Sequence, residues 1–222
     1  PLALAKANKA EKYLKRPELT NLLIAQAAEL SGDLNKATKT YKSLIQNPQT
    51  RFVGLRGILK QKLAEGQTEI AIKIAKEAFS IKPAHTETQD ILLQLQAELG
   101  DWRGARKTLG AKFRKGSIPK DIHRRRDAVL ALAEAKDLLG EEASIEQQEA
   151  AIEANRLSPD LVPAAALAAR AYIQRGNARN AIRIINKAWQ SQPHPDLKIV
   201  FYEICANESD EEKLKRLQKL CR

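Results

Sequence analysis

The sequence predicts an all-α solenoid of about five helix–turn–helix repeats, because two residue types that end helices recur with nearly the same period. Glycine followed by a polar residue recurs in steps of 34, 34, 40 and 36 residues, at Gly32, Gly66, Gly100, Gly140 and Gly176. Proline recurs independently in steps of 35, 36, 40 and 34 residues, at Pro48, Pro83, Pro119, Pro159 and Pro193. The alternation of apolar and polar residues that is typical of strands is nowhere sustained.

The two periodic residue types have different backbone roles. Glycine tolerates the left-handed conformation in which many helices end, and proline cannot continue a helix that has already formed. Between these marks, apolar residues keep helical spacing. Two such faces are Leu22, Leu23, Ala27 and Leu30 before Gly32, and Ile70, Ile74, Ala78 and Ile81 after Gly66. We therefore expect about thirteen helices and no sheet.

Small residues follow the glycines at fixed distances. Alanine and proline stand at the same offsets from Gly66 (Ala71, Ala78, Pro83) and from Gly176 (Ala181, Ala188, Pro193). Ala37 and Ala105 hold the first of these positions after Gly32 and Gly100. This spacing resembles the 34-residue tetratricopeptide (TPR) repeat, over residues 18–193. The fourth unit departs from it, since Ile145 replaces the alanine and the longer spacing indicates an insertion near residues 144–148.

The positions of the repeats along the sequence predict how the chain is organised. Residues 1–17 are expected to form the helix of a leading half-repeat, residues 18–194 one continuous right-handed TPR-like superhelix, and residues 195–222 C-terminal capping helices broken near residues 207–210. A cap is needed because an uncovered last repeat exposes its apolar face. The chain begins at Pro1 and contains no Met, so we expect it to be a piece of a longer protein.

Composition narrows the class of function. The chain has 222 residues, with 38 Lys and Arg against 27 Asp and Glu, which gives a net charge of +11. That balance favours an acidic partner, an anionic membrane surface or nucleic acid. Two cysteines exclude a disulfide scaffold and fit a reducing compartment. No stretch approaches the ~20 apolar residues of a membrane span.

Several segments go beyond the generic repeat: residues 51–57 (RFVGLRG), 160–165 (DLVPAA), 188–189 (AW) and 193–197 (PHPDL), with 100–102 (GDW) and 124–126 (RRR). Together they resemble the HemY-type TPR proteins of proteobacteria. The resemblance implies an inner-membrane protein with two N-terminal membrane helices outside this sequence and a TPR domain on the cytoplasmic side. It also implies a link to late protohaem formation, and it carries no catalytic residues.

Motifs of enzymes and bound cofactors are missing from the sequence. It contains no phosphate loop, dinucleotide fingerprint or Gly-x-Ser-x-Gly elbow, so we expect no enzyme. Cys205 and Cys221 lie sixteen residues apart without a nearby histidine, so we expect no metal site. No cofactor is predicted, and haem is the alternative, through arginines at its propionates or through an axial ligand. The candidate axial ligands are His85, His123, His194, Tyr172 and Tyr202.

Cations on the first helix of each repeat predict a concave groove that binds a partner. Counted back from the turn glycines, Arg56, Lys60 and Arg170 should point into this groove, and Arg51 should lie near its entrance. Guanidinium groups hold carboxylates in a two-pronged fork, which suits a peptide terminus or an acidic segment. Glu87, Asp90 and Gln94 stand at comparable positions in the third unit, so the groove should be mixed in charge. The alternative is that these cations are solvated or paired with Glu87 and Asp90.

A second basic set could instead face an anionic membrane surface, nucleic acid or only solvent. It comprises Arg103, Arg106, Lys107, Lys112, Arg114, Lys115, Lys120, Arg124, Arg125 and Arg126. Nucleic acid is the weaker hypothesis, since stacking aromatics and a repeated pattern of polar pairs are missing.

Trp102 and Trp189 are expected to pack between helices, and Asp160 is expected to cap a helix. The sequence thus favours a protein-docking scaffold for late haem-biosynthesis enzymes, with a porphyrin-binding module as the alternative.

Overall fold

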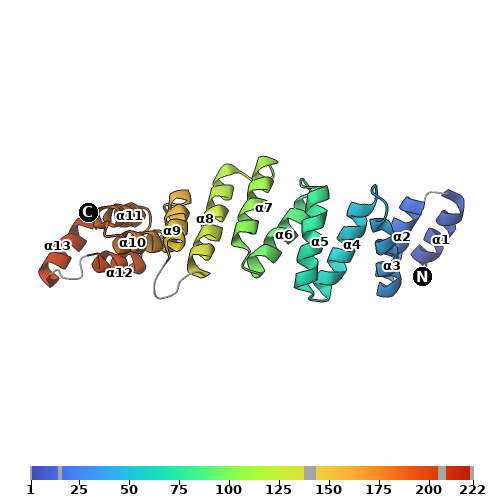
Figure 1. The fold of residues 1–222 in the computed structure, drawn as a ribbon, viewed down its shortest axis with the longest axis horizontal. Coiled ribbons are helices and arrows are strands. Elements are labelled where there is room, and N and C mark those ends of the chain that lie inside the picture. The colour runs from blue at the N-terminus through green and yellow to red at the C-terminus, as the bar shows by residue number, and fades with distance from the viewer. Residues whose placement is uncertain (1, 15–16, 138–143, 205–208, 221–222) are drawn as a thin grey trace. The chain divides into compact units, whose positions relative to one another are not determined.

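The computed structural model describes residues 2–14, 17–137, 144–204 and 209–220, and in these ranges the chain is helical with no strand. It divides into two compact units, an N-terminal unit (Pro1–Leu99) with helices α1–α6 and a C-terminal unit (Gly100–Arg222) with α7–α13 (Figure 1). The helices are α1 (Leu2–Leu14), α2 (Pro17–Leu30), α3 (Leu34–Ile45), α4 (Arg51–Ala64), α5 (Thr68–Ile81), α6 (Thr86–Glu98), α7 (Trp102–Arg114), α8 (Lys120–Asp137), α9 (Ile145–Leu157), α10 (Val162–Gln174), α11 (Ala178–Ser191), α12 (Pro195–Glu203) and α13 (Asp210–Leu220).

After α1, the helices follow one another as five pairs, from α2/α3 to α10/α11, and α12 and α13 come last. The prediction of about thirteen helices without a sheet is confirmed for the described residues. Within each unit, every pair of helices in substantial contact lies at most two helices apart along the chain. Within each unit, the helices therefore pack on helices near them in sequence, as expected of a helical-repeat protein.

Glycine ends the first helix of four of the five pairs. Gly32, Gly66, Gly100 and Gly176 have φ values of 80°, 69°, 70° and 69°, in the left-handed region that favours glycine. Gly140, the fifth predicted turn, lies outside the described residues. The polar residue after three of these glycines starts the next helix, because its side chain accepts an N–H of the first turn. These caps are Asp33, Asp101 and Asn177.

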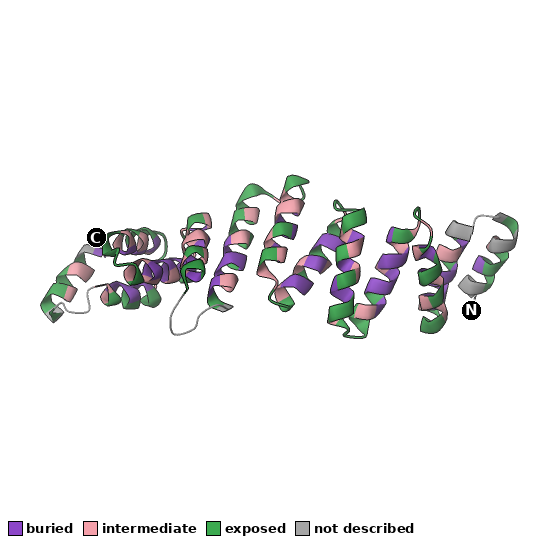
Figure 2. Cartoon of the chain, viewed as in Figure 1, coloured by how far each residue is buried: buried purple, intermediate pink, exposed green. Residues whose placement is uncertain are grey.

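The alanines at the repeat positions are fully buried, as the sequence predicts. They are Ala37, Ala71, Ala78, Ala105, Ala181 and Ala188. A side chain of this size lets neighbouring helices approach closely, and purple buried bands run along the helix faces in Figure 2.

The two apolar faces that indicate helices in the sequence lie in α2 and α5, but they are only partly buried. Leu30 is 85% exposed, and Leu23, Ile70 and Ile81 are also exposed. Leu30 and Ile81 are the last residues of α2 and α5, where neighbouring helices give less cover. The buried stripes are instead formed by Ile24, Ala25, Ala27 and Ala28 in α2 and by Ala71, Ile72, Ala75 and Ala78 in α5.

The end of the C-terminal unit has its own apolar cluster, which joins α10, α11, α12 and α13. Ile185, Leu197 and Val200 are fully buried there, with Leu220 of α13 against them and Trp189 partly buried. The guanidinium of Arg216 lies 4.5 Å from the ring centroid of Phe201. None of the helices in the described ranges combines the length and the apolar character that a bilayer crossing needs.

Candidate functional site

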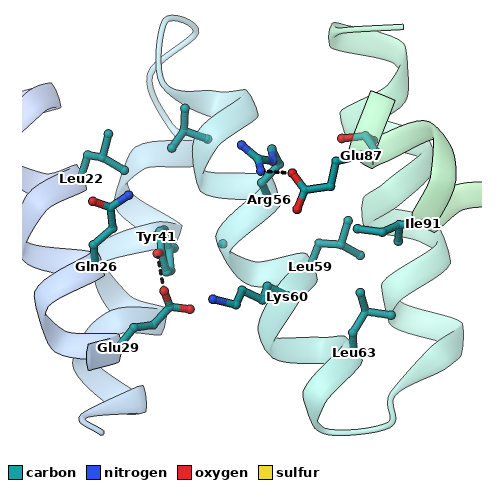
Figure 3. A pocket seen from close by; sticks show the side chains of 13 residues that line it. Leu22, Gln26, Glu29, Tyr41, Arg56, Leu59, Lys60, Leu63, Glu87 and Ile91 are labelled. Carbon is teal, nitrogen blue, oxygen red and sulfur yellow. Dashed lines mark hydrogen bonds and ion pairs between the residues drawn. The ribbon is translucent and has the colours of Figure 1, made fainter. Parts of the chain in front are cut away.

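A hollow of about 300 Å³ opens in the N-terminal unit, among the first helices of three consecutive pairs (Figure 3). Helices α2, α4 and α6 supply nearly all of its lining, and Tyr41 reaches it from α3. The lining comprises Leu22, Gln26, Glu29, Tyr41, Val53, Arg56, Gly57, Leu59, Lys60, Leu63, Glu87, Thr88 and Ile91. The hollow thus contains two of the four predicted groove cations, Arg56 and Lys60.

Two glycines in α4 let the Tyr41 side chain enter the hollow. A Cβ atom on Gly57 would lie 2.4 Å from Cδ1 and Cε1 of the Tyr41 ring, and one on Gly54 would lie 2.7 Å from the Tyr41 carbonyl oxygen. Real Cβ atoms do not approach other atoms so closely, so only glycine permits this contact between α3 and α4. The Tyr41 ring is consequently buried against α4.

The Tyr41 hydroxyl donates a hydrogen bond to Oε2 of Glu29, over 3.0 Å. Burial raises the pKa of Tyr41 to about 12, and the hydrogen bond to Glu29 and the negative charge of that residue act in the same direction. Tyr41 therefore remains a neutral donor near neutral pH. Its role is to hold the Glu29 carboxylate on α2 in a fixed orientation at the edge of the hollow.

Arg56 of α4 forms an ion pair with Glu87 of α6 across the hollow. This is the pairing that the sequence offered as the alternative to a free groove cation, and the participation of Arg56 in partner binding stays a prediction. The two helices are also joined beside this pair, since Phe52 of α4 is buried and its ring lies 5.0 Å from the His85 ring, centroid to centroid.

His85 fixes the start of α6, and therefore the position of Glu87 and Thr88. Its Nδ1 accepts the Thr88 backbone N–H over 3.2 Å, which makes it the N-cap of the helix. Burial lowers the pKa of His85 below its usual 6.5, and Arg56 and Lys82 lower it further, whereas Glu87 opposes them. A protonated Nδ1 cannot accept the N–H, so the cap requires the neutral ring.

We expect the stability of the N-terminal unit to fall as the pH decreases below 6.5. Because the pKa of His85 is lower in the folded chain than in the unfolded chain, the unfolded chain binds the extra proton first. Denaturant unfolding at pH 7.5 and 5.5 measures this effect. The variant His85→Asn keeps a capping acceptor without a titrating group, so it should lose stability less steeply. An equal decrease in the free energy of unfolding between pH 7.5 and 5.5 in both proteins would contradict the role of the neutral His85 ring as a helix cap.

Lys60 has no ion-pair partner among the described residues. It lies one helical turn after Arg56, and Figure 3 shows its ammonium group directed toward the side of the hollow that contains Glu29. Of the two cations in the hollow, Lys60 is thus the one whose charge is not already matched by a carboxylate.

The other two predicted groove cations lie elsewhere. Arg51 is not among the residues that line the hollow, and its Nη2 lies 2.6 Å from Oε1 of Glu77 on α5. Arg170, in the C-terminal unit, forms a two-pronged pair with Glu203 of α12, over 2.9 and 2.8 Å. Arg170 also borders a small hollow of about 70 Å³ between α8, α9 and α10.

Three of the ten residues in the second basic set, Arg103, Arg106 and Arg125, form ion pairs within the C-terminal unit. Nε of Arg106 in α7 donates a hydrogen bond to Oδ1 of Asp127 over 2.6 Å. Its Nη1 lies 3.9 Å from Oε2 of Glu134, and its Nη2 lies 3.8 Å from Oε1 of Glu153. Arg103 forms a further pair with Glu134. These arginines join α7 to α8 and α9, and the membrane, nucleic-acid and solvent alternatives for the set as a whole stay predictions.

The three consecutive arginines of α8 also differ in whether a carboxylate pairs with them. Nη1 of Arg125 donates to Ser158 Oγ and to Asp160 Oδ2 over 2.7 and 2.8 Å. Arg124 and Arg126 are exposed and have no ion pair within the described part of the chain. The prediction that Asp160 caps a helix is also wrong, since Leu161 is the N-cap of α10 and Asp160 accepts from Arg125 and Ser158 instead.

The three candidate histidine ligands each have a packing or capping contact. His85 and His194 accept backbone N–H groups at the starts of α6 and α12, and His123 stacks on Phe113 with centroids 4.4 Å apart. Cys205 and Cys221 lie outside the described residues. Across the described ranges, no group of three or more His, Cys, Asp or Glu side chains could hold a metal ion.

The pairs of helices, their left-handed glycine turns and their buried alanines together match the TPR unit. The fold is an array of TPR-like helical hairpins. No family model matches the chain. It is 24% identical over 201 residues to cellulose synthase operon protein C of Pseudomonas fluorescens (strain SBW25). That match covers 82% of this chain and only 14% of the length of the relative.

Among solved structures, the chain is similar to the MamA protein, with 16% identity, a TM-score of 0.44, and coverage of 80% of this chain and 93% of that one. YrrB, described as a TPR protein with an unusual peptide-binding site, has 16% identity, a TM-score of 0.44 and coverage of 88% and 95%. A TPR protein from Parabacteroides merdae ATCC 43184 has 14% identity, a TM-score of 0.44 and coverage of 92% and 93%.

Proposed function

We propose that the chain is a non-enzymatic scaffold that holds a segment of a protein partner in the hollow of the N-terminal unit. The observation that carries this proposal is the unmatched charge of Lys60 in a hollow lined by the first helices of three hairpins. An ammonium group at such a position can gain a charge-assisted hydrogen bond from a ligand without first losing an internal partner.

The lining indicates the chemistry of the segment. Between α4 and α6, the side chains of Leu59, Leu63 and Ile91 form an apolar side, whereas Glu29 and Lys60 lie between α2 and α4 (Figure 3). A segment that crosses α4 could place an apolar side chain on the first side and a carboxylate near Lys60 on the second. Chain termini and acidic residues both supply that carboxylate.

The partner class that we propose is an enzyme of late haem biosynthesis. It is supported by the resemblance of residues 51–57, 160–165, 188–189 and 193–197 to HemY-type proteins. In this proposal, the full-length protein lies at the bacterial inner membrane with the TPR region on the cytoplasmic side. A porphyrin-binding role stays the alternative prediction.

Binding of short peptides tests the scaffold proposal directly. Twelve-residue peptides selected from a random library on the full chain should share an apolar residue and a nearby carboxylate. The substitution Lys60→Glu should weaken their binding at least about tenfold, because a charge-assisted hydrogen bond contributes about 1.5–3 kcal/mol and 1.4 kcal/mol corresponds to a factor of ten. Titration calorimetry or fluorescence anisotropy gives the affinity.

The matched control is Lys73→Glu, which makes the same change of charge at an exposed lysine of α5 outside the hollow. It should leave the affinity unchanged. Selected peptides that bind both variants as tightly as they bind the original chain would refute docking in this hollow.

A further inference from the structure

The exposed face of α11 carries three cations in one row. Arg179, Arg183 and Lys187 are spaced by four residues, so they follow each other along one side of the helix at about 6 Å per step. We call these three residues the α11 stripe. Asn186 and Gln190 are exposed beside it, and side chains of this region border an open hollow of about 800 Å³.

No carboxylate balances the stripe from within its own hairpin. Residues 161–195 contain Arg170, Arg175, Arg179, Arg183 and Lys187 but no Asp or Glu. Within the described residues, none of the three stripe cations forms an ion pair. Three other arginines of the same unit, Arg106, Arg125 and Arg170, do pair with carboxylates, whereas Arg124 and Arg126 of α8 do not within the described residues. The stripe is therefore a local excess of positive charge that the fold leaves open to solvent.

Packing fixes the direction in which the stripe faces. The opposite side of α11 is buried through Ala181, Ile185 and Ala188, which lie in the apolar cluster with α10 and α12. Ile182, Ile184 and Trp189 are partly buried against the same cluster. The helix cannot turn without exposing this core, so the three cations are held in one line.

The character of this face distinguishes between anionic partners. Stable attachment of a helix to a bilayer requires apolar side chains that insert among the lipids, and single-stranded nucleic acid requires aromatic side chains on which bases stack. Among the exposed side chains of α11, only the methyl group of Ala178 is apolar, and Ile182 and Trp189 are partly buried against the cluster with α10 and α12. A row of guanidinium and ammonium groups with neighbouring amides instead complements a row of carboxylates.

We propose that the α11 stripe is a second docking surface, which binds an acidic helical segment of a partner protein whose carboxylates are also spaced by four residues. Carboxylates spaced in this way recur at about 6 Å along one face of the partner helix and match the stripe in register. This surface acts independently of the hollow in the N-terminal unit, so either can fail without the other.

Two labelled peptides of equal composition test the proposal with the full chain. In the first, glutamates spaced by four residues line one face of an alanine-rich helix, and in the second the same number of glutamates is distributed around the helix. Fluorescence anisotropy at low salt should show at least threefold tighter binding of the first peptide. The substitution Arg183→Glu should remove this preference, and a first peptide with its central glutamate replaced by lysine should bind this variant better than the unchanged peptide does.

The matched control is Arg126→Glu, which reverses an exposed arginine of α8 that has no ion pair among the described residues. It should leave the preference intact, and so should Lys60→Glu in the hollow. Equal affinity of the two peptides, or equal losses in Arg126→Glu and Arg183→Glu, would overturn the proposal and show a response to net charge alone. Displacement of the first peptide by phosphatidylglycerol vesicles or a 20-base-pair DNA duplex at matched anion concentration would also overturn it.

Discussion

Replacing Gly57 with alanine is expected to lower the free energy of unfolding of the N-terminal unit by about 1–3 kcal/mol, the usual cost of overpacking a core. The added methyl group would lie 2.4 Å from the Tyr41 ring. That ring is buried between α3 and α4 and has little room to move. Denaturant unfolding, with hydrogen exchange of the α3 and α4 amides, measures the loss and locates it.

Gly110→Ala in α7 is the matched control, because a Cβ atom there would meet only Nη1 of Arg114, at 3.6 Å. Alanine favours a helix interior over glycine by about 1 kcal/mol, so this variant should be slightly more stable than the original chain. A Gly57→Ala variant that gains stability to the same degree would show that Tyr41 can leave its place. It would then also lose the hydrogen bond to Glu29.

Replacing Arg106 with methionine is expected to destabilise the C-terminal unit by about 2 kcal/mol. Methionine retains much of the apolar stem, but it leaves Asp127, which is only 14% exposed, without its donor. Removing one partner of a largely buried ion pair is costly because the other charge stays desolvated. Hydrogen exchange should show that α8 and α9 open more readily, since the contacts of Arg106 reach both helices.

Arg103→Met provides the comparison for Arg106. Arg103 pairs with Glu134 but is 80% exposed, and exposed pairs contribute about 0–1 kcal/mol. We therefore expect a small loss in this variant. Equal losses in the free energy of unfolding at positions 103 and 106 would contradict the view that Arg106 is the main contributor to the ion pairs that join α7 to α8 and α9.

The repeat pattern of this chain was predictable because its determinants are local. A glycine in the left-handed region and an alanine at a close approach act through the backbone and through size, whatever the rest of the chain does. Gly66, Ala71 and Ala78 illustrate this, since their roles follow from their offsets along the chain. Gly116, which also has a positive φ value of 71°, ends α7 without belonging to the period, so the spacing of the other glycines does not predict it.

The hollow was only partly predictable, because it depends on how three helices pack. Glu29 and Tyr41 were missed, since they meet only when α2, α3 and α4 are in place. The short spacing of Gly54 and Gly57 was the signal that could have indicated close packing on α4. Arg51 was assigned to the groove although it stands five residues before Arg56. That separation turns a helix by about 140°, so the two side chains leave different faces.

Within each unit, helices pack on helices near them in sequence, which gives the unit a low contact order. Few distant segments must meet before stabilising contacts form, so each unit should fold quickly for its size. Within a unit, formation can start at any hairpin and spread to those beside it, as in a one-dimensional cooperative array. A local defect, such as a cavity in one hairpin, is then felt most strongly by the hairpins on either side.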